Sequence, residues 1–124
     1  MTNKLIPSED EEQMAVIDWA ERMTPIYPAL KLLHHIPNGG KRSKAEAGRF
    51  RAMGVKSGVP DLFLPVPRGK FHGLWIEMKR TKDGKLSENQ KWWLKALNSL
   101  GYSAQVAYGA EQAIRQLEEY LNLK

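Results

Sequence analysis

Two carboxylates and a lysine occur in this sequence at a spacing that suits metal-assisted hydrolysis of a phosphodiester bond. Asp61 follows Pro60, and Glu77-Met78-Lys79 comes later in the chain. A hard divalent cation held by carboxylates can stabilise charge on a phosphate, activate a water molecule and help an alkoxide leave. Asp61 and Glu77 are therefore the candidate metal ligands, and the main-chain carbonyl of Met78 could complete the set. Lys79 could orient the attacking water, and it would need a lowered pKa to act as a general base as well.

The two acids come together if the segments that carry them pair as antiparallel strands. Both segments are largely apolar, and the sequence PVPRGKFHG between them has the prolines and glycines of a loop. Pairing about Gly69 sets Asp61 opposite Glu77, and opposed residues of such a pair lie about 5 Å apart on one face of the sheet. Alternation along the second strand then places Lys79 on the same face as Glu77.

Four helices and four extended segments are predicted along the chain. Three of the helices begin at a serine that is followed three residues later by Glu or Gln, which is the spacing of a capping box. Proline or glycine ends these helices. The helices start at Ser8, Ser43, Ser87 and after Gly109, and the extended segments span residues 30–36, 61–64, 74–79 and 102–108.

This order of elements predicts one α/β domain over residues 1–124, with a mixed central sheet and helices on both of its faces. The strand at 102–108 is expected to run parallel to the strand at 74–79, because a helix connects them. Apolar residues repeat along that helix at helical spacing. We expect it to bury Trp93, Ala96, Leu97 and Leu100.

The composition narrows the kind of site and the location of the protein. The chain contains no cysteine, which excludes disulfides and thiolate zinc sites and favours Mg²⁺ or Mn²⁺ on oxygen ligands. No apolar stretch is long enough to cross a membrane, and the first ten residues turn acidic, unlike a signal peptide. We therefore expect an intracellular protein.

Charge is distributed unevenly along the chain. Residues 1–24 carry two basic and six acidic side chains, whereas residues 41–80 carry ten basic and three acidic ones. This basic segment beside a carboxylate pair predicts a polyanionic partner, and nucleic acid is the first candidate. The alternative is a basic surface that is only solvated and binds no partner. The residues expected to flank the site and to contact phosphates are Arg42, Lys44, Arg49, Arg68, Lys70, Arg80, Lys85 and Lys91.

Several segments together resemble the virus-type replication-repair nuclease family, the VRR-NUC domain, within the PD-(D/E)xK nuclease superfamily. They are KSGVPDLFL at residues 56–64, LWIEMK at 74–79 and LSENQ at 86–90. In the first helix, Glu9 and Gln13 fit the family's glutamate followed four residues later by glutamine. The resemblance covers nearly the whole chain. It implies a restriction-endonuclease-like core of αβββαβ order, to which this chain adds a short helix at 43–53 and a helix at its C-terminal end.

The resemblance also implies a function. It implies a Mg²⁺- or Mn²⁺-dependent DNA endonuclease of DNA repair. Small stand-alone members of the family look like homodimers that cut branched DNA such as four-way (Holliday) junctions. A viral or mobile-element origin is suggested in the same way. Two alternatives stay open: a non-catalytic module that binds DNA junctions, and a nuclease that acts on RNA.

The resemblance further assigns catalytic roles to Gln90 and Glu9. For Gln90 the capping box with Ser87 is an equally good explanation. Glu9 is one of four acids in the first turn of its helix, where the helix dipole favours acids in any case.

Overall fold

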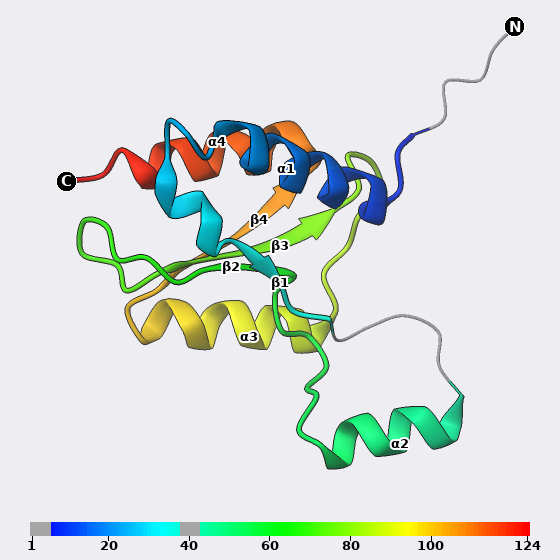
Figure 1. Cartoon of the computed structure of the whole chain (residues 1–124). Helices are drawn as coiled ribbons and strands as arrows, with labels where there is room; N and C mark the ends of the chain where they lie inside the picture. The colour runs from blue at the N-terminus through cyan, green and yellow to red at the C-terminus, as the bar shows by residue number, and fades with distance from the viewer. Residues whose placement is uncertain (1–5, 38–42) are drawn as a thin grey trace, which may run out of the picture.

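A computed structural model describes residues 6–37 and 43–124, which form a four-stranded sheet between two layers of helices (Figure 1). The strand order is β1-β2-β3-β4, and only β3 and β4 run parallel. Helices α1 and α4 cover one face and α3 covers the other. The elements are α1 (Glu9–Met23), the 3-10 helix η1 (Pro28–Leu32), β1 (His34–His35), α2 (Lys44–Ala52), β2 (Leu62–Leu64), β3 (Leu74–Lys79), α3 (Glu88–Ser99), β4 (Ser103–Tyr108) and α4 (Ala110–Leu121).

The predicted α/β class is confirmed, as are the mixed sheet, the αβββαβ core order and the two additional helices α2 and α4. The parallel return of β4 through α3 is confirmed as well. No helix within residues 6–37 and 43–124 has both the length and the apolar character needed to cross a bilayer.

All three predicted capping boxes are formed. In each, the serine hydroxyl accepts a hydrogen bond from the backbone N–H three residues later, and the side chain of that later residue accepts one from the serine N–H. Two backbone donors that a helix start would leave unpaired are thereby satisfied at each site. The pairs are Ser8 with Glu11, Ser43 with Glu46, and Ser87 with Gln90.

Strands β2 and β3 pair in the register that the sequence predicts. Leu62 lies opposite Ile76, and Leu64 lies opposite Leu74. The chain reverses at Gly69, whose φ of 55° lies in the left-handed region that glycine adopts at little cost. Because a shift by one residue would turn every side chain to the other face, this register decides which residues of β3 are buried in the core.

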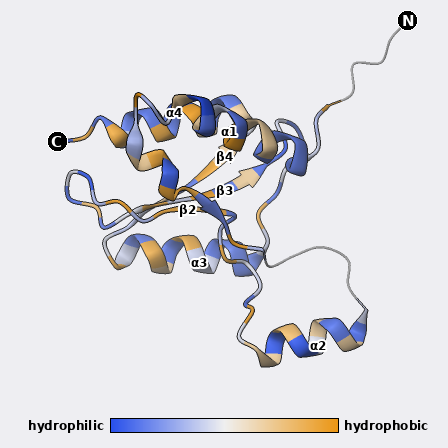
Figure 2. Cartoon of the chain, viewed as in Figure 1, coloured by the Kyte–Doolittle hydropathy of each residue, from blue (hydrophilic) through white to orange (hydrophobic). Residues whose placement is uncertain are grey.

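The two faces of the sheet differ in chemistry. Aliphatic side chains fill the space between the sheet and helices α1 and α4, and along both helices hydrophobic and hydrophilic residues alternate (Figure 2). On the other face Phe63 and Trp75 stack with their ring centroids 4.0 Å apart, and Tyr102 meets both rings edge-on. The centre of the aliphatic core consists of Val16, Ala20, Leu62, Leu64, Leu74, Ile76, Met78, Ala107, Ala113 and Leu117.

Two local predictions were wrong. Residues 30–36 were expected to be extended, but the chain forms η1 at Pro28–Leu32 and only His34–His35 is a strand. Proline near the start favours a helical turn, because its fixed φ suits the first turn and its missing N–H is not needed there. Leu100 was expected to be buried but is 65% exposed, since α3 ends at Ser99 and the chain turns away at the next residues.

Amide side chains cover the free edge of β4, which is an outer strand of the sheet. Asn98 of α3 bonds both backbone groups of Ala104, at 2.9 and 3.0 Å. Gln116 of α4 donates to the Val106 carbonyl, and Gln112 accepts from the N–H of the last residue of β4. These bonds occupy groups that would otherwise be open to pairing with a further strand.

Candidate active site

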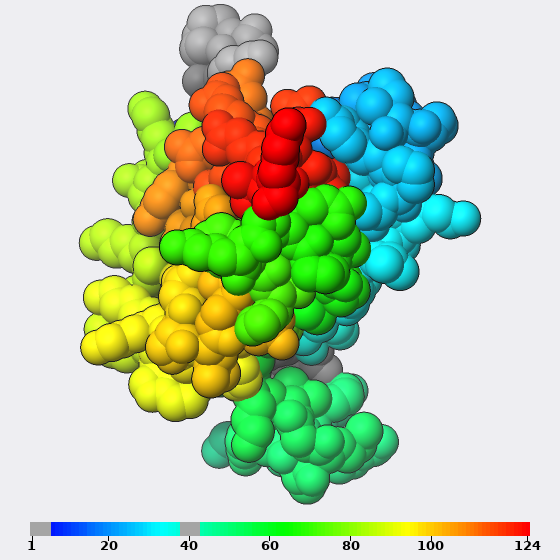
Figure 3. All heavy atoms as spheres, turned by 90° about the vertical axis from the view of Figure 1, so that its left-hand side faces the viewer, coloured from blue at the N-terminus to red at the C-terminus, as the bar shows by residue number. Residues whose placement is uncertain are grey.

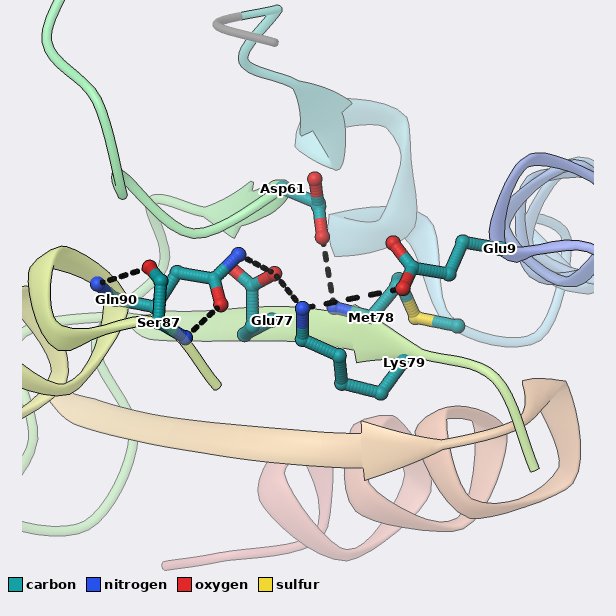
Figure 4. A network of polar contacts seen from close by, with 7 residues as sticks. All are labelled: Glu9, Asp61, Glu77, Met78, Lys79, Ser87 and Gln90. Carbon is teal, nitrogen blue, oxygen red and sulfur yellow. Dashed lines mark hydrogen bonds and ion pairs between the residues drawn. The ribbon is translucent and has the colours of Figure 1, made fainter. Parts of the chain in front are cut away.

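Asp61, Glu77 and Lys79 meet at the end of the sheet that lies away from the Gly69 turn (Figure 4). Asp61 stands directly before β2, and its Oδ2 accepts a hydrogen bond of 2.8 Å from the N–H of Met78. The N–H and C=O of one strand residue point to the same edge, so the Met78 carbonyl also faces Asp61. The Met78 side chain lies in the core instead, 1% exposed.

Glu77 is almost fully buried and is held by Gln90. Its side chain is on the α3 side of the sheet, with a residue exposure of 2%, and its Oε2 accepts a 3.0 Å hydrogen bond from Gln90 Nε2. The Oε1 of the same glutamine accepts from the Ser87 N–H at 2.8 Å. The capping box therefore aims the Gln90 amide at the carboxylate, so Gln90 caps α3 and contacts the candidate site at once.

Lys79 lies between two carboxylates. Its Nζ is 3.9 Å from Glu77 Oε2 and 3.8 Å from Glu9 Oε2. The lysine side chain is 8% exposed, whereas that of Glu9, in the first turn of α1, is 44% exposed. Among the acids of that turn, Glu9 is therefore placed beside the site, while Glu11 completes the capping box with Ser8.

The surroundings of Glu77 favour its protonated form. Burial, the neighbouring charge of Asp61 and a hydrogen bond between the two carboxyl groups raise the pKa of Glu77 to about 9. Lys79 lowers this pKa and Glu9 raises it, but both effects are smaller. Two carboxyl groups this close cannot both ionise cheaply without a cation, which is the situation of paired carboxylates that share a site.

The donor set fits a magnesium or manganese ion. Asp61 and Glu77 offer carboxylate oxygens, and the Met78 carbonyl faces the same place. Within the described residues, no three His, Cys, Asp or Glu side chains gather into a cage. A hard octahedral ion that keeps several of its waters needs only a few protein ligands.

The predicted phosphate-binding residues separate into two groups. Lys44 and Arg49 lie on α2, Lys91 lies in the first turns of α3, and Arg80 and Lys85 lie in the segment that joins β3 to α3. The segment after β3 and the start of α3 lie at the active-site end of the sheet, whereas α2 lies well below the sheet and is joined to this end by the segment that leads to β2 (Figure 1). Arg42 lies outside the described residues.

Arg68 and Lys70 lie at the other end of the molecule, so the expectation that they flank the site is wrong. They border the turn at Gly69, where Arg68 and Phe71 exchange backbone hydrogen bonds. A Cβ on Gly69 would lie 3.5 Å from the side chain of Leu123, near the C-terminus. The same hairpin that brings Asp61 to Glu77 carries its loop to the opposite end of the sheet.

Glu12 is a buried residue of this region that the sequence-based reasoning missed. Its Oε1 accepts from the Ala110 N–H at the start of α4, at 2.9 Å, and its Oε2 accepts from Thr81 Oγ1 at 3.0 Å. Gly109, the N-cap of α4, donates its own N–H to the carbonyl of Lys79. Glu12 thus ties α1 to the chain just beyond β3. The signal in the sequence was a glycine N-cap, which has no side chain to accept from the helix start.

Comparison with known proteins agrees with this geometry. The sequence matches the model of the VRR-NUC domain family over residues 8–111. A solved structure described as a "VRR_NUC domain protein" shares 31% sequence identity and superposes with a TM-score of 0.81, covering 97% of this chain and 93% of that chain. No curated protein matches the sequence.

Proposed function

The chain belongs to the VRR-NUC family and is a nuclease domain, and from this premise we propose that it is a Mg²⁺- or Mn²⁺-dependent endonuclease that cuts branched DNA. The observation that carries the proposal is the convergence of Asp61, Glu77 and Lys79 at one end of the sheet. Acids and a lysine in this arrangement can hold a cation and position a water at a phosphate.

Each residue has a definite task in this proposal. Asp61 and Glu77 hold the cation together with the Met78 carbonyl, and Gln90 keeps Glu77 in place through its 3.0 Å hydrogen bond. The bound cation supplies Lewis acidity towards the phosphate and lowers the pKa of a water. Lys79, buried and 3.9 Å from Glu77, orients the attacking water and screens a phosphate oxygen.

Glu9 completes the group from α1. Its carboxylate lies 3.8 Å from Lys79 Nζ, so it holds the ammonium group on the side away from Glu77. An amino group held between two acidic side chains cannot readily turn away from the phosphate. Glu9 therefore positions Lys79 instead of contacting the substrate itself.

The preference for branched DNA and the homodimer belong to the same proposal. A four-way junction has two equivalent strands to cut, and a two-fold symmetric dimer presents two equivalent sites to them. Basic residues on α2, on α3 and after β3 supply the charge for phosphate contacts around each site.

Cleavage of a panel of labelled DNAs tests the proposal. Four-way junctions, forks, flaps and linear duplexes are incubated with EDTA, Mg²⁺ or Mn²⁺, and the solution mass of the protein is measured in parallel. We expect metal-dependent cuts in the junction and a dimeric mass, and loss of cleavage in Asp61→Asn and Glu77→Gln but not in Glu21→Gln, which alters an exposed residue of α1. Binding without cleavage in any metal would indicate a binding module, and faster cutting of an RNA version would indicate an RNA nuclease.

A further inference from the structure

Helix α2 stands apart from the rest of the domain. It has nine residues, and none of them is buried. In the space-filling view it forms a separate lobe below the body of the molecule (Figure 3). Helices in proteins take most of their stability from packing, and isolated helices of fewer than about 12 residues are marginal in water. The aliphatic core of the domain includes no residue of α2.

The segment after α2 fixes its base near the active site. Gly58, with φ of 93°, packs against the start of α3, where an added Cβ would lie only 2.6 Å from the carbonyl carbon of Asn89. Asn89 precedes Gln90, which contacts Glu77. The chain then continues from Gly58 to Asp61. Helix α2 and the segment that follows it therefore project from the end of the molecule where Asp61 and Glu77 meet.

The charge on α2 indicates what binds it. Lys44, Arg49 and Arg51 are exposed, and Glu46 is the only acid of the helix. Lys44 and Arg51 are two turns apart and share a face, whereas Arg49 points elsewhere around the helix. A second copy of α2 would bring the same positive charge. Phosphates are the complementary partner.

We propose that α2 is a phosphate-binding arm whose helix is stabilised by the nucleic acid substrate instead of by the domain core. The proposal rests on the proposed nuclease function and adds how the substrate is held. Lysine and arginine side chains of the arm neutralise phosphates beside the scissile strand and release counterions. The contact fixes a helix that is otherwise close to its folding midpoint, so binding and helix formation are coupled.

The first test removes charge from the arm. The triple variant Lys44→Gln/Arg49→Gln/Arg51→Gln is compared with Arg22→Gln/Lys31→Gln/Arg115→Gln, which makes the same charge change at exposed positions on α1, η1 and α4. Dissociation constants for a labelled four-way junction are measured by fluorescence anisotropy in EDTA at several salt concentrations. We expect the arm variant to make the slope of log Kd against log salt shallower by about 2 to 3, because each lost phosphate contact contributes about 0.9. The control variant should change it by less than 1.

The second test changes the helix and leaves its charges in place. Gly48 lies inside α2, and none of the described atoms is within 4 Å of a Cβ built there. Gly48→Ala favours the helix and should tighten junction binding by up to about fivefold, whereas Gly48→Pro breaks the helix and should weaken binding at least tenfold. Because α2 buries no residue, both variants should melt within about 2 °C of the wild type.

The outcomes separate the arm from the function it serves. Suppose that the wild type binds and cuts the junction. If both triple variants then lose the same affinity, or if both Gly48 variants bind like the wild type, the proposal that α2 binds phosphates is refuted. The proposed nuclease function is unaffected by either result. Arm variants that split a dimer and leave DNA affinity unchanged refute the proposal for α2 too, in favour of a subunit contact. A wild type that neither binds nor cuts any nucleic acid overturns the proposed function and the arm together.

Discussion

The raised pKa of Glu77 predicts that the metal-free protein loses stability as the pH increases. The pKa of this carboxyl group is about 9 in the folded protein and 4.5 in an ordinary setting. Between these values the folded state holds a proton that the unfolded state has released. The free energy of unfolding therefore decreases with pH in this window: the contribution is complete below about pH 4.5 and is lost as the pH rises through about 9.

The size of the effect follows from linkage. One proton difference between the folded and unfolded states changes the free energy of unfolding by about 1.4 kcal/mol per pH unit. Raising the pH from 6 to 8 should therefore destabilise the protein by about 3 kcal/mol. For a chain of this length that corresponds to a fall of roughly 10 °C in Tm.

Glu77→Gln isolates this contribution. The amide oxygen can still accept from Gln90 Nε2, and the amide nitrogen can donate to Asp61, but the side chain no longer titrates. Thermal unfolding is followed by circular dichroism in EDTA at pH 6, 7 and 8 for the wild type, for Glu77→Gln and for the exposed control Glu21→Gln. We expect Tm to fall with pH in the wild type and in the control, and to fall much less in Glu77→Gln. The three proteins are identical except at the exchanged residue, so the difference between the wild type and Glu77→Gln, judged against the control, reports Glu77.

Addition of Mg²⁺ or Mn²⁺ at pH 8 should restore most of the lost Tm in the wild type and little in Glu77→Gln, because the cation replaces the proton between the two carboxylates. If the wild type is no more sensitive to pH than Glu77→Gln, then Glu77 is already ionised at neutral pH. In that case the carboxyl pair is not crowded and the reasoning given for the metal site is wrong.

Three further predictions follow from other contacts. Metal binding should release close to one proton per site at pH 7, seen as a dependence of the calorimetric enthalpy on buffer ionisation, and Glu77→Gln should abolish that dependence. Glu12→Ala should lower the free energy of unfolding in urea by about 3 kcal/mol, because it leaves the Ala110 N–H without its acceptor, while Glu12→Gln should lose less than half of that. Asn98→Ala should lower the free energy of unfolding by about 2 kcal/mol, because both backbone groups of Ala104 at the edge of β4 lose their partners. It should also increase aggregation, measured by light scattering. An unchanged scattering signal would show that the Asn98 amide does not protect this edge.

Local signals were enough to predict most of the backbone. Ser8 and Ser43 begin helices because their hydroxyls satisfy backbone donors within the same turn, which depends only on residues three positions apart. The pairing of β2 with β3 was also predictable, because a single loop joins the two strands and a shift of the register by one residue would turn apolar side chains out of the core. Pro28 was the local signal that was misread.

Only the part of the site that lies on the β2–β3 hairpin was predictable from the sequence. The register brings Asp61 to Glu77, but Glu9 and Gln90 come from helices far away in the sequence. Their spacing within each helix is compatible with several orientations. For Gln90 the cap and the contact with Glu77 turned out to be one arrangement, because the hydrogen bond to the Ser87 N–H directs the amide at the sheet.

The sequence by itself determined where most of the helices and strands lie, which face of β3 carries Glu77 and Lys79, and that the chemistry suits a divalent cation. Only the tertiary structure decided that Glu12 is buried at the start of α4, that α2 remains outside the core, and that Glu77 is desolvated enough to keep its proton. The physical reason is the range of the interactions. Caps and strand alternation are set by residues a few positions apart, whereas burial and charge crowding depend on how distant segments pack together.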